Sequence, residues 1–185
     1  MVLIGVTGGT GVGKSTAVSL FGWPTISADT VFHGLLETDS QMQSGIYESF
    51  GTVNRNELAQ VVFKDNKKRE LLNSITHPFI IRAIFDELEK YAINGTEAVV
   101  LDAPLLIESG IHQKCNKIIA VVASKHHRIA RLMARDNITQ KQAESRIRSG
   151  PKDDFYISEA DLVIRNNGDL EDLRDKCERL LQYLP

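Results

Sequence analysis

The chain has 185 residues, of which 42% are hydrophobic and 25% charged, and its 22 basic and 24 acidic side chains give a net charge of −2. This balance predicts one soluble globular domain with a substantial core. The small net charge argues against the broad basic field of a dedicated nucleic-acid-binding protein, so we expect no nucleic-acid partner.

The cysteines and the apolar runs indicate in which cellular compartment we expect the protein. Cys115 and Cys177 lie far apart and form no C-x-x-C pair, which argues against a disulfide framework or a zinc site. The longest apolar runs have only strand length, and the N-terminus lacks the basic flank of a secretory signal. We therefore expect a cytoplasmic protein with reduced cysteines and no membrane association.

Five short apolar runs predict the strands of a sheet. The first is rich in β-branched residues and ends in a glycine cluster, as a buried parallel strand does. The runs are residues 2–6, 24–27, 98–101, 117–122 and 161–164. Because helical patterns separate most of them, we predict an α/β fold with a parallel sheet and helices on both faces.

Between the second and third runs lie some seventy residues that read as helical. Ile80, Ile84, Leu88 and Tyr91 recur at helical spacing, and Pro78 suits the first turn of that helix. We predict one domain with a helical insertion and a lid: a core of residues 1–29, 96–124 and 153–185, an acceptor-binding region of residues 30–95, and a lid of residues 125–152.

The segment Gly8-Gly9-Thr10-Gly11-Val12-Gly13-Lys14-Ser15 matches the phosphate-binding pattern GxxxxGK[ST] between a predicted strand and a predicted helix. Glycines let the backbone wrap around phosphate oxygens, so that successive N–H groups face the anion. Lys14 supplies a charge for the β- and γ-phosphates, and Ser15 a hydroxyl for Mg²⁺. We expect a nucleoside triphosphate here, bound by the loop from Gly9 to Ser15 and by Thr16.

The same loop serves switches, motors and kinases, so the reaction depends on other residues. A GTPase would need a guanine-reading NKxD after a strand, whereas Asn116-Lys117-Ile118-Ile119 lacks the aspartate and precedes its strand. A motor would need more chain. The size therefore favours a small-molecule kinase.

Residues 125–152 contain eight basic and two acidic residues. Arg128, Arg131 and Arg135 share one predicted helix face, and Arg146 and Arg148 follow on the return. Such arginines can neutralise charge on a γ-phosphoryl group, although a solvated basic face explains each one alone.

Two carboxylates follow predicted strands at the carboxyl edge, where doubly wound sheets bind ligands. Asp29 there can accept or orient the proton of an attacking hydroxyl, or it can cap a helix. Asp102 can reach Mg²⁺ directly or through water, or it can cap its strand end.

Together these motifs resemble the dephospho-CoA kinase family over nearly the whole chain. The segments that carry the resemblance are Thr7 to Thr16, Ser27-Ala28-Asp29, Asn54-Arg55, His77-Pro78, Asp102 to Glu108, Arg131 with Arg135-Asp136, and Asn166-Asn167-Gly168. The family phosphorylates the ribose 3′-hydroxyl of dephospho-CoA with ATP. This chain departs from the family pattern at four positions. The family usually has aspartate at the positions of Ser27 and Asn54, and glutamine at or near those of Arg128 and Gly150.

The resemblance implies roles for the remaining residues. Asp29 becomes the general base and Arg135 the lid arginine, with Arg131 and Asn167 near the nucleotide. Glu108, expected on a short helix after Pro104, falls on the acceptor side, although a solvated helix face explains it too. The acceptor residues so implied are Asp29, Arg55, His77, Pro104, Leu105 and Glu108.

Some of these residues also have plainer explanations. A lone histidine such as His77 is more often a packing or capping residue, and an Asn-Gly turn alone explains Asn167. Two other functions stay open: a kinase for a nucleoside monophosphate or another small metabolite, and a nucleotide-binding regulatory module.

Overall fold

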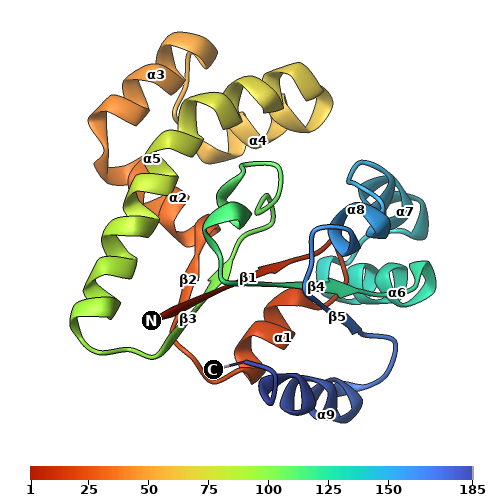
Figure 1. Ribbon diagram of the computed structural model, residues 1–185. Coiled ribbons are helices and arrows are strands. Elements are labelled where there is room, and N and C mark those ends of the chain that lie inside the picture. Colours follow the sequence, from red (N-terminus) through yellow and green to blue (C-terminus); the bar gives the residue numbers. More distant parts are fainter. Residues whose placement is uncertain (185) are drawn as a thin grey trace. The chain divides into compact units, whose positions relative to one another are not determined.

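The computed structural model describes residues 1–184, apart from the side chains of Phe63 and Lys64. The chain forms two compact units (Figure 1). The sheet unit contains Met1–Thr25 and the chain from Tyr91 onward, and the helical unit contains Ile26–Lys90.

The sheet has five strands: β1 (Val2–Thr7), β2 (Thr25–Ser27), β3 (Ala98–Asp102), β4 (Lys117–Val122) and β5 (Leu162–Arg165). Their order across the sheet is β2-β3-β1-β4-β5. The pairs β1–β3, β1–β4 and β4–β5 are parallel. All five predicted strands are confirmed to within two residues at each end, and so is the α/β fold with a parallel sheet flanked by helices.

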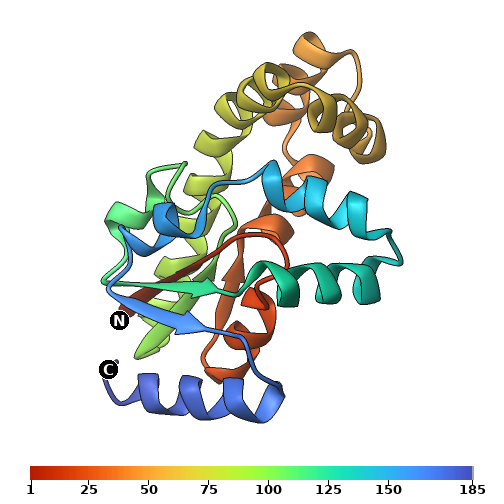
Figure 2. The same cartoon turned by 90° about the vertical axis from the view of Figure 1, so that its right-hand side faces the viewer.

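The two faces of β1 pack against different partners, because successive side chains of a strand point to opposite sides. Ile4 and Val6 belong to the main apolar cluster, which includes residues of α1 (Lys14–Leu20) and α9 (Leu170–Leu181). These helices contact each other and lie side by side in both ribbon views (Figures 1 and 2). On the opposite face Gly5 leaves room for the side chains of the segment that follows β3.

After β4 the chain forms a helical hairpin of α6 (Lys125–Asp136) and α7 (Gln140–Arg148), which lie side by side in Figure 2. Thr139 begins α7 with a capping box: its hydroxyl accepts the Gln142 N–H, and the Gln142 side chain accepts the Thr139 N–H at 2.8 Å. The 3-10 helix η1 (Ile111–Lys114) precedes β4, and α8 (Asp153–Ile157) precedes β5.

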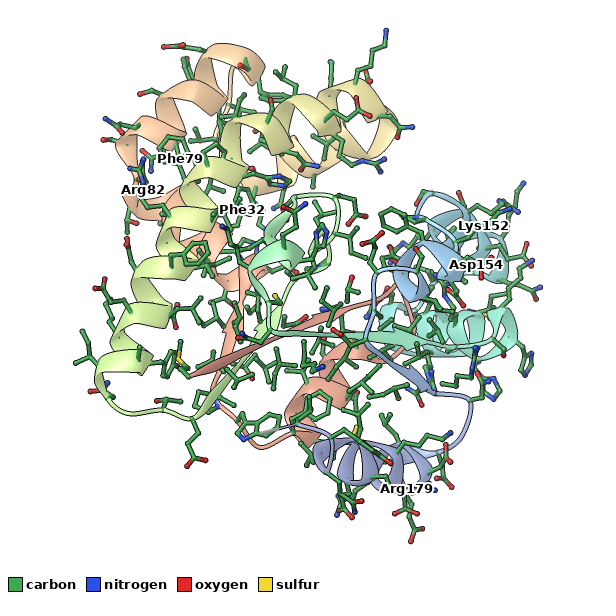
Figure 3. All side chains as sticks on the ribbon, in the orientation of Figure 1. Phe32, Phe79, Arg82, Lys152, Asp154 and Arg179 are labelled. Atoms are coloured by element: carbon green, nitrogen blue, oxygen red, sulfur yellow. The ribbon has the colours of Figure 1, made fainter. Side chains whose placement is uncertain are left out.

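The helical unit consists of α2 (Ala28–Thr38), α3 (Ser40–Phe50), α4 (Arg55–Lys64) and most of α5 (Asn66–Ile93). Polar residues cap all four helices: the side chains of Ser27, Asp39, Asn54 and Asp65 accept N–H groups of the first turns. An apolar cluster joins all four, with Met42, Ile46 and Leu58 buried at its centre and Phe32 and Phe79, labelled in Figure 3, at its edge.

The prediction that Pro78 lies in the first turn of a helix was wrong, because α5 begins twelve residues earlier and runs through it. Proline removes one helical hydrogen bond, and that loss usually ends a helix. Here Leu72 and Ile75, which precede Pro78, pack against the apolar cluster of the helical unit. Their burial favours a continuous helix despite the missing N–H.

None of the helices among the described residues is long and apolar enough to cross a bilayer.

We predict that Gly5→Ala destabilises the protein by about 1–3 kcal/mol through overpacking. The added methyl carbon would lie 2.7 Å from Leu106 Cδ2 and 2.8 Å from Cys115 Sγ. Gly34→Ala is the matched control, because Gly34 lies within α2 with open space beside it and alanine favours helix by about 0.5–1 kcal/mol. Urea unfolding should give midpoints that move in opposite directions, and an unchanged midpoint for Gly5→Ala would contradict the packing of β1.

Candidate active site

The loop Gly8–Ser15 joins β1 to α1, as predicted. Two of its glycines take conformations and positions that other residues cannot. Gly8 has a φ of 149° and Gly13 a φ of 89°. A Cβ on Gly8 would collide with the Val121 carbonyl of β4, and one on Gly13 with the side-chain amide of Asn166. The loop therefore lies tightly against the ends of its neighbouring strands.

The loop leads directly into α1, and Gly13 is the N-cap of this helix without a side-chain cap. N–H groups at the start of a helix point away from the helix, so this end attracts an anion. Ser15 and Thr16 follow in the first turn, and both are exposed. This arrangement suits a bound polyphosphate.

Lys14 forms an ion pair with Asp102. The sheet register explains the pairing, because Asp102 at the end of β3 lies beside Val6 of β1. The two side chains are only 12% and 15% exposed. The structure thus brings together two charged residues that the sequence analysis assigned to phosphate and metal binding.

The carbonyl groups of the loop are held from outside. Arg128 Nε donates to the Thr10 carbonyl at 2.8 Å. Asn166 Nδ2 donates to the Val12 carbonyl at 2.8 Å, and Arg131 Nη1 to the same oxygen at 3.2 Å. Side chains from α6 and from the end of β5 therefore fix the phosphate loop.

Arg131 lies between this loop and the loop after β5. Besides Val12, it donates to the Asn166 backbone carbonyl and to Asn166 Oδ1, each at 3.0 Å, and to the Gly168 carbonyl at 3.4 Å. Partial burial lowers the pKa of the guanidinium. The N–H groups of Arg131 thus donate to carbonyl oxygens of the protein itself.

Of the two asparagines after β5, Asn166 contacts the phosphate loop, whereas the sequence analysis singled out Asn167. Asn167 is exposed, and its side-chain oxygen accepts the Ser124 N–H at 2.8 Å at the start of α6. Its role toward the nucleotide stays a prediction. An Asn-Asn-Gly sequence directly after a strand was the signal for both residues.

Arg128 is the second site residue to which the sequence analysis gave no individual role. It is 6% exposed, and its Nη1 donates to Asp153 Oδ1 of α8 at 3.1 Å. Arg128, Arg131 and Arg135 do lie on one helix, as their spacing in the sequence predicted. The sequence did not predict how deeply each of the three side chains is buried.

Arg135 is exposed and forms a two-pronged pair with its neighbour Asp136, at 2.7 Å from Nε and 3.0 Å from Nη2. Asp136 also accepts a hydrogen bond of 2.5 Å from Arg146 of α7. The hydrogen bond from Arg135 lowers the pKa of Asp136, and Asp136 in turn raises the pKa of Arg135. This cluster ties α6 to α7 at their turn.

The segment after β3 forms successive turns, so the expected short helix after Pro104 was wrong. The backbone hydrogen bonds of these turns span different numbers of residues. The Ser109 N–H donates to the Leu105 carbonyl, four residues back, whereas the Gly110 N–H donates to the Ile107 carbonyl, three residues back. Leu106 is buried, and Glu108 is exposed. Leu106 lies against Gly5, which anchors the segment to the sheet.

Tyr156 of α8 is buried, and this burial raises the pKa of its hydroxyl to about 12. The negative charge of Glu108 raises this pKa further.

In the helical unit, Asp29 lies in the first turn of α2 and is exposed. The alternative that Asp29 caps this helix was wrong, because Ser27 is the N-cap and its hydroxyl accepts the Thr30 N–H at 3.3 Å. Arg55 is exposed and begins α4 after its cap Asn54. His77 is half-buried within α5, and burial lowers its pKa.

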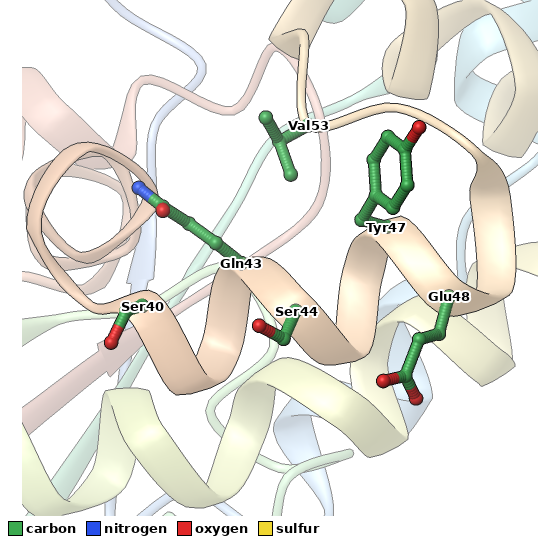
Figure 4. A pocket seen from close by; sticks show the side chains of 6 residues that line it. All are labelled: Ser40, Gln43, Ser44, Tyr47, Glu48 and Val53. Carbon is green, nitrogen blue, oxygen red and sulfur yellow. The ribbon is translucent and has the colours of Figure 1, made fainter.

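A shallow depression of about 380 Å³ lies on α3 and the loop after it (Figure 4). It contains none of the site residues expected from the sequence. Its lining residues are Ser40, Gln43, Ser44, Tyr47, Glu48 and Val53.

Comparisons with known proteins agree over almost the whole chain. A family model described as dephospho-CoA kinase matches residues 2–172. A dephospho-CoA kinase of Oryza sativa subsp. japonica is 36% identical, and the alignment covers 98% of this chain and 84% of the relative.

Two solved structures are similar to this one. A protein from Thermus thermophilus has a TM-score of 0.82 and 28% identity, with 100% of this chain and 98% of the other covered. A dephospho-CoA kinase from Campylobacter jejuni has a TM-score of 0.70 and 25% identity, with 98% and 96% covered.

We predict that Asp136 titrates below its ordinary pKa of 3.8 because of the hydrogen bond from Arg135. Because the folded-state pKa of Asp136 lies below 3.8, the ionised carboxylate stabilises the fold fully at pH values above 3.8. This stabilisation is lost as the pH falls through the lowered pKa of the folded protein. A ¹³C NMR titration of the carboxyl group would measure the midpoint, with Asp136→Asn identifying the resonance. A midpoint at or above 3.8 would contradict the pairing of Asp136 at the α6–α7 turn.

Proposed function

Because this chain belongs to the dephospho-CoA kinase family, we propose that its phosphate loop binds ATP while Asp29 prepares the ribose 3′-hydroxyl of dephospho-CoA for attack. The enzyme is a kinase that converts dephospho-CoA and ATP into coenzyme A and ADP. Family membership confirms the resemblance, the enzyme class and the P-loop kinase fold. It does not favour another acceptor or a regulatory module.

The main support for these proposed roles is the hydrogen bonding of the phosphate loop. Its carbonyls at Thr10 and Val12 are hydrogen-bonded by side chains outside the loop, and this arrangement leaves N–H groups for phosphate oxygens. Gly9 to Thr16 would hold the triphosphate. Lys14 lies at the start of α1 and would add a positive charge toward the β- and γ-phosphates.

Ser15 and Asp102 fit a Mg²⁺ ion by their donor chemistry. A hydroxyl and a carboxylate are the hard oxygen ligands that Mg²⁺ prefers, usually together with water and phosphate oxygens. Ser15 is exposed at the start of α1, and Asp102 lies at the neighbouring strand end. No group of three or more His, Cys, Asp or Glu residues that could hold a metal occurs among the described residues. A bound Mg²⁺ would neutralise charge on the β- and γ-phosphates.

Asp29 is the proposed general base. In the reaction, the 3′-oxygen forms a bond to the γ-phosphorus, the bond between this phosphorus and the β,γ-bridging oxygen breaks, and ADP leaves. The hydroxyl proton passes to the Asp29 carboxylate. Two facts support this assignment: the carboxylate is exposed, and Ser27 already performs the capping of α2.

Arg135 is proposed to stabilise the charge on the transferred group. It is exposed on α6, within the region 125–152 that we propose as a lid, so its pair with Asp136 is in contact with solvent. The Arg135 side chain is 66% exposed, so solvent screens this pair, and Asp136 keeps its hydrogen bond from Arg146 when Arg135 turns to a phosphate. Arg131 and Asn167 are proposed on the nucleotide side of the same region.

The acceptor would be bound by Arg55 and His77 of the helical unit and by the segment from Pro104 to Glu108. Arg55 is a cation at the N-terminus of α4, where the helix dipole disfavours positive charge. A phosphate group bound there would be attracted by the arginine, while the Asn54 side chain keeps the N–H groups of Asn56 and Glu57. The pyrophosphate of dephospho-CoA has the matching chemistry. We propose residues 30–95 as the acceptor region.

We place the reaction in the cytoplasm. The support for this compartment is chemical, because Cys115 and Cys177 are both free thiols, which an oxidising compartment disfavours. The proposal includes no nucleic-acid partner.

We predict acceptor-dependent ADP release with dephospho-CoA and only the background rate with AMP, CMP or shikimate, measured by a coupled assay. Lys14→Ala should reduce turnover at least about a hundredfold, because one charge aimed at the transferred phosphates is lost. Lys117→Ala is the control, since Lys117 is half-exposed on β4 and pairs with Asp161. Equal turnover with AMP, or a Lys14→Ala enzyme at the wild-type rate, would refute the proposed function.

We predict that Asp29→Asn lowers kcat by about 10²–10⁴ and leaves the Kd for ATP unchanged, because a general base acts only in the chemical step. Glu37→Gln, an exposed carboxylate on the same helix α2, should keep the wild-type kcat. Steady-state kinetics and calorimetry with ATP separate the two quantities. A kcat within twofold of the wild type would remove Asp29 from the mechanism.

A further inference from the structure

Arg128 is a buried arginine in the first turn of α6. Its side chain is 7% exposed, and it lies between the phosphate loop and α8. Nε donates to the Thr10 carbonyl at 2.8 Å, and Nη1 donates to Asp153 Oδ1 at 3.1 Å. Burying a guanidinium is costly unless it is paired and hydrogen-bonded, so both contacts are needed to keep it there.

The phosphate loop is shaped around this guanidinium. A Cβ on Gly9 would lie 2.7 Å from Arg128 Nη2, so that any larger residue would push the arginine out. The close approach of α6 to the loop continues at Gly11, where a Cβ would meet the Arg128 backbone oxygen at 3.0 Å. Arg128 therefore contacts the loop at several successive residues.

The hydrogen bond to Thr10 has a consequence on the other side of the same peptide bond. A peptide unit is planar and trans, so the Thr10 carbonyl and the Gly11 N–H point in opposite directions. When Arg128 holds the carbonyl, the Gly11 N–H is fixed facing away from Arg128. Asn166 and Arg131 do the same to the peptide of Val12 and Gly13 by holding the Val12 carbonyl.

We propose that Arg128 is a positioning residue for ATP: it fixes the Thr10–Gly11 peptide so that the Gly11 N–H faces the phosphate oxygens before ATP binds. Asp153 holds the guanidinium in the required direction from α8. This inference rests on the proposed role of Gly8–Ser15 as the ATP-binding loop. A loop whose donors are fixed in advance needs no reorganisation on binding, so its hydrogen bonds to the anion are stronger.

Four variants separate positioning from a general structural role. Arg128→Met keeps most of the apolar stem and removes both hydrogen bonds. Arg128→Gln retains an N–H donor that can bond to the Thr10 carbonyl and removes the ion pair. Asp153→Asn keeps a polar partner for Arg128 without the charge. Arg179→Met is the control, because Arg179 lies on α9, labelled in Figure 3, and its Nε donates to the Asp175 carbonyl of the same helix.

The experiment measures the Kd for ATP by calorimetry, the KM for each substrate, and the rise in Tm that saturating ATP causes. Hydrogen bonds to charged groups typically contribute enough for about a ten- to hundredfold change in affinity. For Arg128→Met we expect a Kd and a KM for ATP raised by about this factor. The rise in Tm with ATP should be smaller, and the KM for dephospho-CoA should stay within twofold of the wild type.

Arg128→Gln should recover most of the affinity for ATP, Asp153→Asn should lose about threefold to tenfold, and Arg179→Met should match the wild type. If Arg128→Met does not fold, Arg128→Gln and Asp153→Asn decide the question through the same quantities. Wild-type affinity for ATP in Arg128→Met, or in both other variants, would overturn the proposal. Equal increases in the KM for both substrates would overturn it as well, because they indicate general destabilisation.

The proposed function fails in a different way. In that case the wild-type protein itself would bind ATP weakly, or Lys14→Ala would bind it as well as the wild type. A wild type that needs Lys14 for ATP binding, together with an Arg128→Met variant that binds ATP normally, would refute only the role of Arg128.

Discussion

A backbone loop can offer its N–H groups to an anion only if its carbonyls turn the other way and find donors there. In this protein the outward carbonyls of Thr10 and Val12 find Arg128, Arg131 and Asn166. These donors lie more than a hundred residues further along the chain. The parallel sheet brings them within reach, because the carboxyl ends of β1, β3, β4 and β5 lie along one edge.

Depth of burial gives different functions to arginines that share a helix face. Arg128 is buried and holds the loop, and Arg131 is half-buried and joins the loop to the segment after β5. Arg135 is exposed and pairs with its neighbour Asp136. An arginine whose donors are occupied by buried carbonyls cannot leave them cheaply, whereas an exposed pair exchanges with little loss. This difference in burial agrees with the proposed role of Arg135 at the transferred phosphoryl group.

Local patterns predicted the strands and the phosphate loop, because β-branched runs and a glycine-rich motif need no distant residue to be recognised. They did not predict that α5 continues through Pro78, which depends on the burial of Leu72 and Ile75 against other helices. They also could not predict that Asn166, next to Asn167, contacts the loop, since both residues have the same composition signal. Contacts such as that of Arg128 with Asp153 follow from the tertiary arrangement of α6 and α8 alone.

The departures from the family pattern at Ser27 and Asn54 have a common physical explanation. Serine and asparagine, like aspartate, accept N–H groups at helix starts, and here Ser27 caps α2 and Asn54 caps α4. Each cap directly precedes the turn that carries a proposed functional residue, Asp29 or Arg55. A neutral cap keeps the helix start intact and removes one negative charge from its surroundings. At α4 this loss favours an anionic ligand beside Arg55, so the substitution is compatible with the proposed acceptor chemistry.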